Sequence, residues 1–250
     1  MKRSQSSKVI IVVVLCLLIT VPTTLAANHS LVWSVNIDDE FTYALQRKTI
    51  DPSGISFVPV WMLFVLNCSE GQKFTALVTE IDEIPSDIPV EDPIPSLEMT
   101  LTRSNDSFVL MTGTSVFGRP TGDWDFQTER LNLSQYEYIS LIDDQSNWGV
   151  REEYSFTIGA ATYSYFYELR YSKVTGTLDF SRFRISSFGS VLVDIVIAQW
   201  SEGMPTILPP DTDVTAIMLV AIVAAVFVIV AFLAYRWIKK PKGLAAQLGR

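Results

Sequence analysis

The chain has 250 residues, and 48% of them are hydrophobic. Its formal net charge is −8 at pH 7, but this charge is unevenly distributed. Residues 27–213 hold all 27 acidic residues and only 11 of the 19 basic ones, which gives this part a net charge of −16. A surface this acidic repels nucleic acid and anionic lipid headgroups, so we expect neither to be its partner.

The N-terminus has the composition of a secretory signal peptide. Basic residues precede an apolar run over residues 9–19, and small residues follow as far as Ala27. A basic head, a short apolar core and small residues at the exit are typical of a secretory signal, and the core is too short to span a bilayer comfortably. We predict a signal peptide over residues 1–26, cleaved after Ala26 or Ala27, with an uncleaved signal anchor as the alternative.

Most of residues 27–201 alternate apolar and polar side chains with the period of two that indicates β-strands. Turn residues separate the runs, and short turns join the last three, which predicts an antiparallel meander. We therefore expect a mainly β extracellular domain over residues 27–201, built as an antiparallel curved sheet or a β-sandwich. The predicted strands cover residues 41–46, 74–79, 97–102, 107–111, 163–171, 177–185 and 191–200.

Two segments and one strand depart from simple alternation. Residues 57–66 (FVPVWMLFVL) are mostly apolar and predict a short helix or a buried strand. Residues 84–95 hold four prolines and predict a loop without ladder hydrogen bonds. Within the strand at 177–185 the apolar parity changes between Phe180 and Phe183, which indicates a bulge or a strand covered on both faces.

Two further segments follow different patterns. Residues 131–144 place Leu133, Tyr136 and Ile139 at helical spacing after polar cap candidates, which predicts a helix. Residues 202–213 are rich in proline and predict a short, stiff stalk.

Residues 214–235 form an apolar run without a charge, a glycine or a proline, and basic residues follow at once. A helix of this length, at about 1.5 Å per residue, is roughly 33 Å long and crosses a hydrocarbon core of about 30 Å. Basic residues mark the cytoplasmic side of a span. We predict a transmembrane helix at 214–235 and a basic cytoplasmic tail at 236–250, so that the chain is a single-pass protein of the cell membrane with its N-terminal domain outside.

The side chains that most often carry catalysis near neutral pH are scarce. His29 is the one histidine and lies near the predicted cleavage site, where we expect a frayed chain. Cys68 is the one cysteine of the exported part and is expected to be buried. This argues against Ser-His-Asp and Cys-His hydrolases and leaves too few ligands for zinc or copper. We predict no enzyme activity, no catalytic residue, no cofactor and no metal site.

Neighbouring carboxylates leave two alternatives open. Asp123 and Asp125 flank Trp124, and such pairs would suit a two-carboxylate glycosidase with a sugar-stacking ring. Oxygen ligands for extracellular calcium would come from acidic clusters, although none has the spacing of a known calcium loop. We prefer the interpretation that these carboxylates are solvated residues of loops and that Trp124 packs beside them. The other acidic clusters are Asp143 with Asp144, residues 38–40 and residues 80–92.

Four N-x-S sequons lie in the exported part, where glycosylation enzymes would reach them. The strongest candidate is Asn105, because it belongs to an Asn-Asp turn signal. The sequon asparagines are Asn28, Asn67, Asn105 and Asn132.

Two short motifs resemble a known class of secreted proteins. Residues 33–43 (WSVNIDDEFTY) are similar to an opening W-x-V-x-x-G-D-x-F-x-Y, with Asp38 in place of the glycine. Residues 171–178 (YSKVTGTL) are similar to a later Y-x-K-x-T-G-x-L hairpin. Both resemble archaeal choice-of-anchor proteins, which carry interchangeable C-terminal anchors. The resemblance implies an archaeal envelope protein that is largely β and has no assigned activity.

These features predict a single-pass cell-surface glycoprotein whose acidic, non-catalytic β ectodomain binds a protein, glycan or lipid, or builds the envelope. The alternatives are a carboxylate-dependent, glycan-active enzyme and an accessory subunit of a membrane transport or signalling complex. A ladder of Tyr163, Tyr165 and Tyr167 predicts sheet packing, with ligand stacking as the alternative. An apolar cavity would favour lipid or small-ligand binding, whereas converging carboxylates would favour the enzyme.

Overall fold

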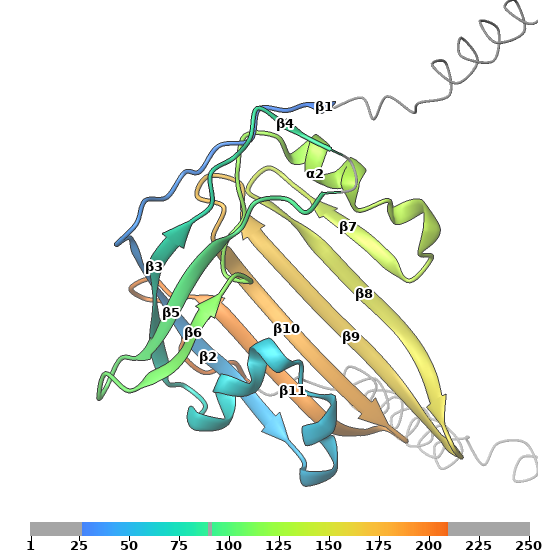
Figure 1. Ribbon diagram of the computed structural model, residues 1–250. Coiled ribbons are helices and arrows are strands. Elements are labelled where there is room, and N and C mark those ends of the chain that lie inside the picture. Colours follow the sequence, from blue (N-terminus) through green and yellow to red (C-terminus); the bar gives the residue numbers. More distant parts are fainter. Residues whose placement is uncertain (1–26, 90–91, 210–250) are drawn as a thin grey trace, which may run out of the picture. The chain divides into compact units, whose positions relative to one another are not determined.

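A computed structural model describes residues 27–89 and 92–209 of the chain. These residues are mainly β, and nine strands form one antiparallel sheet in the order β6-β5-β3-β2-β11-β10-β9-β8-β7 (Figure 1). The edge strands β6 and β7 do not pair with each other, so the sheet curves without closing. The expectation of a curved antiparallel sheet is therefore confirmed, and the β-sandwich alternative is not formed.

Every predicted strand coincides with a strand of the structure, and the last three are neighbours as predicted. The sequence pattern did not predict β7 and β8. Two further short strands, β1 (Ala27–Asn28) and β4 (Asp87–Ile88), pair with each other. The large sheet consists of β2 (Glu40–Ile50), β3 (Lys73–Ile81), β5 (Leu97–Arg103), β6 (Val109–Thr114), β7 (Ile139–Asp143), β8 (Asn147–Ile158), β9 (Ala161–Ser172), β10 (Leu178–Ser187) and β11 (Ser190–Gln199).

The apolar segment at residues 57–66 is helical, as one of its two alternatives predicted. Phe57 ends one 3-10 helix, η1 (Pro52–Phe57), and residues 60–66 belong to a second, η2 (Val60–Asn67). Asp51 begins η1 by accepting a hydrogen bond from the backbone N–H of Ser53 at 2.9 Å. Pro59 separates the two helices because it offers no backbone N–H to continue the first.

The helix predicted over residues 131–144 is wrong. The α-helix α2 (Trp124–Arg130) ends before this segment, and only a single turn, η3 (Leu133–Gln135), follows. Asn132 adopts a left-handed conformation with φ 45°, which interrupts helical geometry. Residues 139–143 instead form β7 and pair with β8. Pairing with the sheet thus overrides the helical spacing of the apolar side chains.

Residues 84–89 and 92–95 form the predicted loop except for the two residues of β4, and residues 90–91 lie outside the described part. In β10, the parity of the apolar residues changes between Phe180 and Phe183 because the strand is covered on both faces, which was one of the two predicted causes. The two rings lie on opposite faces of the sheet. Arg182 and Phe183 are consecutive residues in unbroken register, whereas the register shifts between Leu178 and Phe180. The bulge therefore falls at Asp179, upstream of the predicted position.

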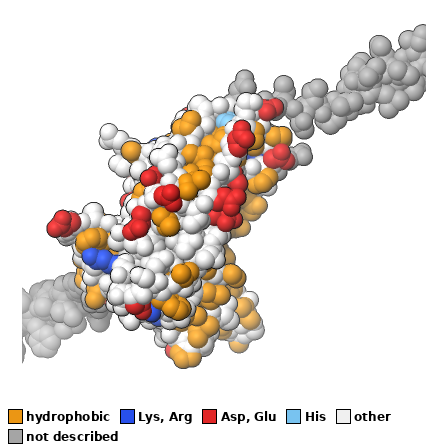
Figure 2. Space-filling model, turned by 60° about the vertical axis from the view of Figure 1, so that its left-hand side comes forward, with side chains coloured by type: hydrophobic (Ala, Val, Ile, Leu, Met, Phe, Trp, Pro, Cys, Tyr) orange, Lys and Arg blue, Asp and Glu red, His pale blue; other side chains and the backbone are white. Residues whose placement is uncertain are grey.

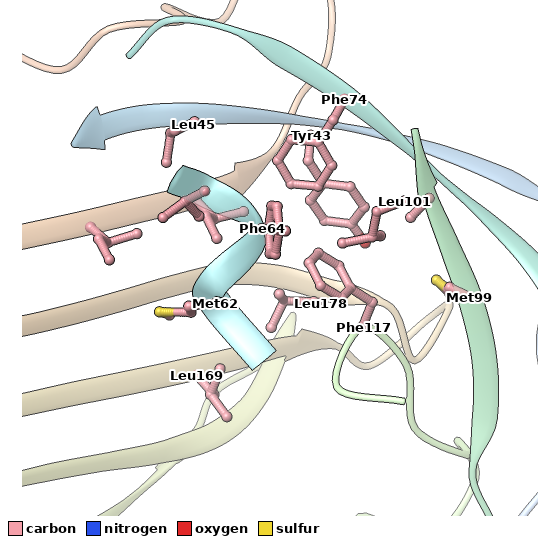
Figure 3. Close-up of a cluster of buried hydrophobic side chains, with 14 of the residues drawn as sticks. Tyr43, Leu45, Met62, Phe64, Phe74, Met99, Leu101, Phe117, Leu169 and Leu178 are labelled. Carbon is pink, nitrogen blue, oxygen red and sulfur yellow. The ribbon is translucent and has the colours of Figure 1, made fainter. Parts of the chain in front are cut away.

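The main core lies on the inner face of the curved sheet, where η2 packs against the strands (Figure 3). Tyr43 of β2 stacks on Phe74 of β3, with ring centroids 5.5 Å apart, and Phe64 of η2 meets Phe74 at 5.1 Å. Full burial of one such side chain stabilises the fold by roughly 1.5–3 kcal/mol. Among the apolar side chains of the sheet, Trp148 and Val193 are buried, while Phe156 and Phe166 are partly buried on opposite faces.

The connections between strands gather at two ends of the sheet because neighbouring strands are antiparallel. We call these ends the upper rim and the lower rim, as they lie in Figure 1. The upper rim holds residues 82–89, 92–96, 144–146 and 173–177, and the lower rim holds residues 51–72, 104–108, 159–160 and 188–189.

The chain turns back after β11 and packs on the domain. The side-chain amide of Gln46 donates a hydrogen bond to the carbonyl of Pro205 at 2.7 Å, and the side chain of Ile207 lies on Gly71. The first residues of the predicted 202–213 stalk therefore belong to the domain surface as far as Ile207.

Several predictions concern residues that the structure does not describe: the signal peptide at 1–26, the end of the stalk at 210–213, the span at 214–235 and the tail at 236–250. Within residues 27–89 and 92–209, no helix has the length and apolar character needed to cross a membrane.

Candidate functional site

The inner face of the sheet is filled by η1 and η2 near its centre but is hollow over β8, β9 and β10. Two hollows lie there, which we call the upper pocket and the lower groove. The upper pocket has a volume of about 540 Å³ and the lower groove about 450 Å³. Both volumes fall in the usual range for sites that bind small molecules.

The upper pocket has an aromatic floor and walls from four segments far apart in the sequence. Odd-numbered residues of β9 form the floor because alternate side chains of a strand point to the same face. Trp61 of η2 covers the floor from one side, and α2 and residues 93–96 close the other side. The floor consists of Tyr167, Leu169 and Tyr171.

A glycine in the β9–β10 hairpin fixes the position of Arg119 at this pocket. The N–H of Arg119 donates to the carbonyl of Gly176 at 2.8 Å. A Cβ atom on Gly176 would lie 2.0 Å from the carbonyl oxygen of Arg119, and its φ of 73° also favours glycine. The hairpin motif that we noted in the sequence at residues 171–178 therefore acts as a backbone support for this arginine.

The two arginines that line the upper pocket have no carboxylate partner in the part of the chain that the structure describes. The guanidinium of Arg119 lies over the rings of Trp148 and Tyr171, at 5.4 and 5.3 Å from their centroids. Arg130 donates to the carbonyl of Pro89 at 2.7 Å. Among the described residues, neither arginine forms an ion pair, and no Asp or Glu lines the pocket.

A buried amide in the same pocket has an unused acceptor. Gln127 of α2 is 1% exposed, and its Nε2 donates to the carbonyl of Pro120 at 2.8 Å. Its Oε1 has no hydrogen-bond partner among the described residues. A buried acceptor without a donor costs about 1–3 kcal/mol, so a bound group with an O–H or N–H would relieve this cost.

The lower groove is almost entirely aromatic and aliphatic. Tyr154 of β8 stacks on Tyr165 of β9 with centroids 4.6 Å apart, and Phe57 of η1 faces Phe156 at 6.3 Å. Tyr165 also meets Phe183 edge to face at 5.7 Å. The predicted tyrosine ladder thus packs against the core and also lines both hollows. The remaining lining residues are Ser56 and Ile185.

Glu152 lies on the same face as this aromatic surface and is hydrogen-bonded to Tyr165. Burial raises the pKa of the Glu152 carboxyl, although the hydrogen bond from Tyr165 opposes this. Burial also raises the pKa of Tyr165 and of Tyr167, so both phenols remain protonated donors at neutral pH.

The carboxylates singled out in the sequence hold local structure and line neither hollow. Asp123 caps α2 by accepting from the N–H of Phe126 at 3.0 Å, and it also accepts from the N–H of Ser30 at 3.1 Å. Asp143 forms an ion pair with Lys173. Asp144 accepts from two backbone N–H groups in the β7–β8 turn, which lowers the pKa of its carboxyl.

Asp125 lies in the first turn of α2, where a negative charge favours the helix. In the described part of the chain, no cluster of three or more His, Cys, Asp or Glu side chains is arranged to hold a metal ion.

His29 is not frayed, contrary to our expectation. The pairing of β1 with β4 holds the chain beside it, and its ring lies 5.1 Å from the ring of Phe126. The Nδ1 atom accepts a hydrogen bond from the N–H of Leu31 at 3.2 Å. Cys68 is buried as predicted, and burial raises the pKa of its thiol.

The sequons occupy different parts of the domain. Asn28 lies in β1, and Asn132 is exposed beside α2. Asn67 and Asn105 are exposed on the lower rim, where Asn105 accepts a hydrogen bond from Gln72 at 3.0 Å.

The outer face of the sheet carries a separate ion network. Asp194 of β11 is 4% exposed and accepts from Arg182 at 2.8 Å and from Arg47 at 3.2 Å. Glu168 of β9 binds Arg151 and Arg170 in the same way. These arginines are paired with carboxylates, whereas Arg119 and Arg130 form no ion pair with any described residue.

Sequence reasoning did not identify Arg119, Gln127 or Arg130. Their positions depend on contacts between segments far apart in the chain, and no local spacing marks them. No protein-family model matches this chain, and neither does any curated protein or solved structure.

Proposed function

We propose that this chain is a single-pass cell-surface protein whose acidic β domain lies outside the cell and binds a small amphipathic anion without catalysis. The ligand's ring or apolar body would lie on Trp61, Tyr167 and Tyr171. Its negative group would meet Arg119 and Arg130, and a ligand O–H or N–H would donate to Gln127.

One observation carries this proposal: the larger of the two hollows has two arginines without carboxylate partners among the described residues, in a domain with a net charge of −16. Elsewhere on the sheet, arginines are neutralised by buried carboxylates such as Asp194 and Glu168. A positive group next to an aromatic floor suits a carboxylate or phosphate attached to an apolar body.

The placement outside the cell rests on the sequence. The basic and apolar N-terminus supports a signal peptide, and residues 214–235 with the following basic tail support a C-terminal anchor. Asp38 adopts φ 72° at the position where the choice-of-anchor opening has glycine, which is the conformation that glycine favours. This turn geometry supports the proposed relationship to archaeal envelope proteins.

A role without catalysis is favoured over the glycosidase alternative. A glycosidase needs two carboxyl groups about 5 to 9.5 Å apart across a cleft. The carboxylates of Asp123, Asp143 and Asp144 are instead bound to backbone N–H groups or to Lys173, and no carboxylate of residues 27–89 or 92–209 lines either hollow.

Two measurements on the full chain test the proposal. Protease added to intact cells should remove the domain and leave a membrane fragment that begins near residue 208; protection of the whole chain would contradict the orientation. Mass spectrometry of protein purified from membranes should detect a co-purified organic anion in the wild type and not in Arg119→Gln. Equal recovery from both proteins would contradict the upper pocket as its site.

A further inference from the structure

We propose that the lower rim of the domain rests on the outer leaflet of the bilayer that anchors the chain. This inference rests on the proposed function, because it requires the anchor at residues 214–235. It adds a contact surface and fixes which end of the sheet faces the membrane.

The lower rim exposes large apolar side chains in or next to each of its connections. The β10–β11 turn presents Phe188 at 82% exposure, and η2 presents Val60 at 79%. Such side chains at several separate turns form a surface that suits insertion into a lipid interface. The space-filling view shows apolar side chains gathered at this lower end (Figure 2). The other exposed apolar residues here are Ile55, Leu63, Leu66, Phe108, Val109 and Ile158.

The chain leaves the described domain at this same rim. Ile207 packs on Gly71, which belongs to the turn between η2 and β3. Seven residue steps separate Ile207 from Val214, where the proposed span begins, and they reach at most about 25 Å when fully extended. An anchor on this tether would keep the lower rim nearer to the lipid than the upper rim.

The distribution of charge agrees with this orientation. Acidic side chains gather toward the upper end of the domain in Figure 2, and the β3–β5 connection of the upper rim alone holds Asp82, Glu83, Asp87 and Asp92. The lower-rim carboxylates are bound to neighbouring donors: Asp51 accepts from Ser53, Glu70 from the N–H of Lys48, and Asp106 pairs with Arg103. The acidic character inferred from the sequence therefore does not oppose contact with lipid at this end.

Lipid suits this surface better than a second protein. Val60, Leu63 and Leu66 share one short face of η2, and the other apolar residues stand on separate turns along the width of the sheet. A bilayer accepts apolar side chains at scattered points in one plane, whereas a protein partner requires close shape complementarity.

Site-directed spin labelling of the full chain in phosphatidylcholine vesicles tests the proposal. Nitroxides would be attached at Phe188→Cys and Val60→Cys on the lower rim, and at Val174→Cys on the upper rim as the matched control, since Val174 is 77% exposed. Cys68 is 3% exposed, and the unmodified chain serves as the labelling blank. Power saturation with oxygen and with a nickel chelate then reports lipid and water contact at each label.

We expect the labels at 188 and 60 to be several-fold less accessible to the nickel chelate than the label at 174, and more accessible to oxygen. Two controls are measured on the same samples. Flotation of the vesicles shows whether the chain is anchored, and binding of 2-naphthoate, an aromatic carboxylate, shows whether the upper pocket is intact. A chain that floats and binds but shows equal chelate accessibility at all three labels would overturn the lower-rim contact alone. A chain that does not float would overturn the anchor, and the contact with it.

Discussion

The side chain of Ile207 packs on Gly71, so a residue without a side chain sets the path by which the chain leaves the domain. A Cβ atom on Gly71 would lie 2.8 Å from Cγ1 of Ile207, and the φ of Gly71 is 81°. We expect Gly71→Ala to destabilise the domain by about 1–3 kcal/mol, because it combines left-handed backbone strain with this clash.

Gly189→Ala is the matched control, since Gly189 has a φ of 80° and no atom within 4 Å of the added Cβ. Urea unfolding should show a larger loss for Gly71→Ala, and limited proteolysis should cut residues 201–209 faster in that variant alone. Equal losses and equal cleavage would contradict the role of Ile207.

The hydroxyl groups of two buried tyrosines differ in their hydrogen bonds. The hydroxyl of Tyr43 is buried without a hydrogen-bond partner among the described residues, whereas the hydroxyl of Tyr171 donates to the carbonyl of Val116 at 3.0 Å. We expect Tyr43→Phe to leave the free energy of unfolding unchanged or raise it by up to about 1 kcal/mol, because it removes an unsatisfied group. Tyr171→Phe should lower it by about 0.5–1.5 kcal/mol. Chemical denaturation measures both free energies of unfolding. A larger loss of stability for Tyr43→Phe than for Tyr171→Phe would contradict these hydrogen-bond assignments.

The carboxyl of Glu152 makes the stability of the domain depend on pH. Burial raises its pKa above the ordinary value of 4.5, so the folded state holds this proton more tightly than the unfolded state. Its contribution to stability is therefore complete below pH 4.5 and is lost as the pH rises through the raised pKa. Glu152→Gln removes this loss, so we expect the variant to melt at a higher temperature than the wild type at pH 7.

The difference in melting temperature should shrink as the pH falls below 4.5, where the wild-type carboxyl is protonated in both states. Thermal melts of both proteins across this pH range measure it. The exposed neighbour Glu153, changed to Gln, controls for removal of one negative charge. If the difference in melting temperature between Glu152→Gln and the wild type did not change with pH, burial of the Glu152 charge would not be the cause of that difference.

Alternation of apolar and polar residues was sufficient to predict the β class and most strands. The meander of β9, β10 and β11 was the clearest case, because each strand has one buried face and short turns fix its neighbours. Two strands escaped this reading. In β8 the charged Glu152 interrupts the apolar residues of one face, and β7 resembles a helix in its spacing, so only their pairing in the sheet identifies them.

The upper pocket could not be predicted from local sequence. Arg119 precedes α2, and Gln127 and Arg130 belong to it. Trp61 lies in η2, far earlier in the sequence. Sequence reasoning gave weight to paired carboxylates, which proved to cap a helix and shape a turn. The one local signal was the hairpin motif at residues 171–178, whose Gly176 allows the close approach of Arg119.

The contact of the lower rim with lipid has a consequence for glycosylation. Asn67 and Asn105 are exposed on that rim, whereas Asn132 lies beside α2, away from it. A glycan at either rim asparagine would hold the domain away from the bilayer. We therefore expect peptide mapping of the chain from its own membranes to find Asn67 and Asn105 unmodified. Occupancy of either site would contradict the contact, and the peptide containing Asn132 shows whether exposed sequons of this protein are used.

Calorimetric titration of the full chain with 2-naphthoate tests most directly the claim that the upper pocket binds an amphipathic anion. Its neutral analogue 2-naphthalenemethanol has the same ring and separates recognition of charge from ring stacking. We expect Arg119→Gln to weaken naphthoate binding about tenfold, which corresponds to about 1.4 kcal/mol, and to leave binding of the neutral analogue unchanged. Arg119→Lys should retain most of the affinity, and Arg184→Gln on the outer face should behave as the wild type. Naphthoate affinity that is equal in the wild type and Arg119→Gln, or no tighter than that of the neutral analogue, would contradict the proposed site.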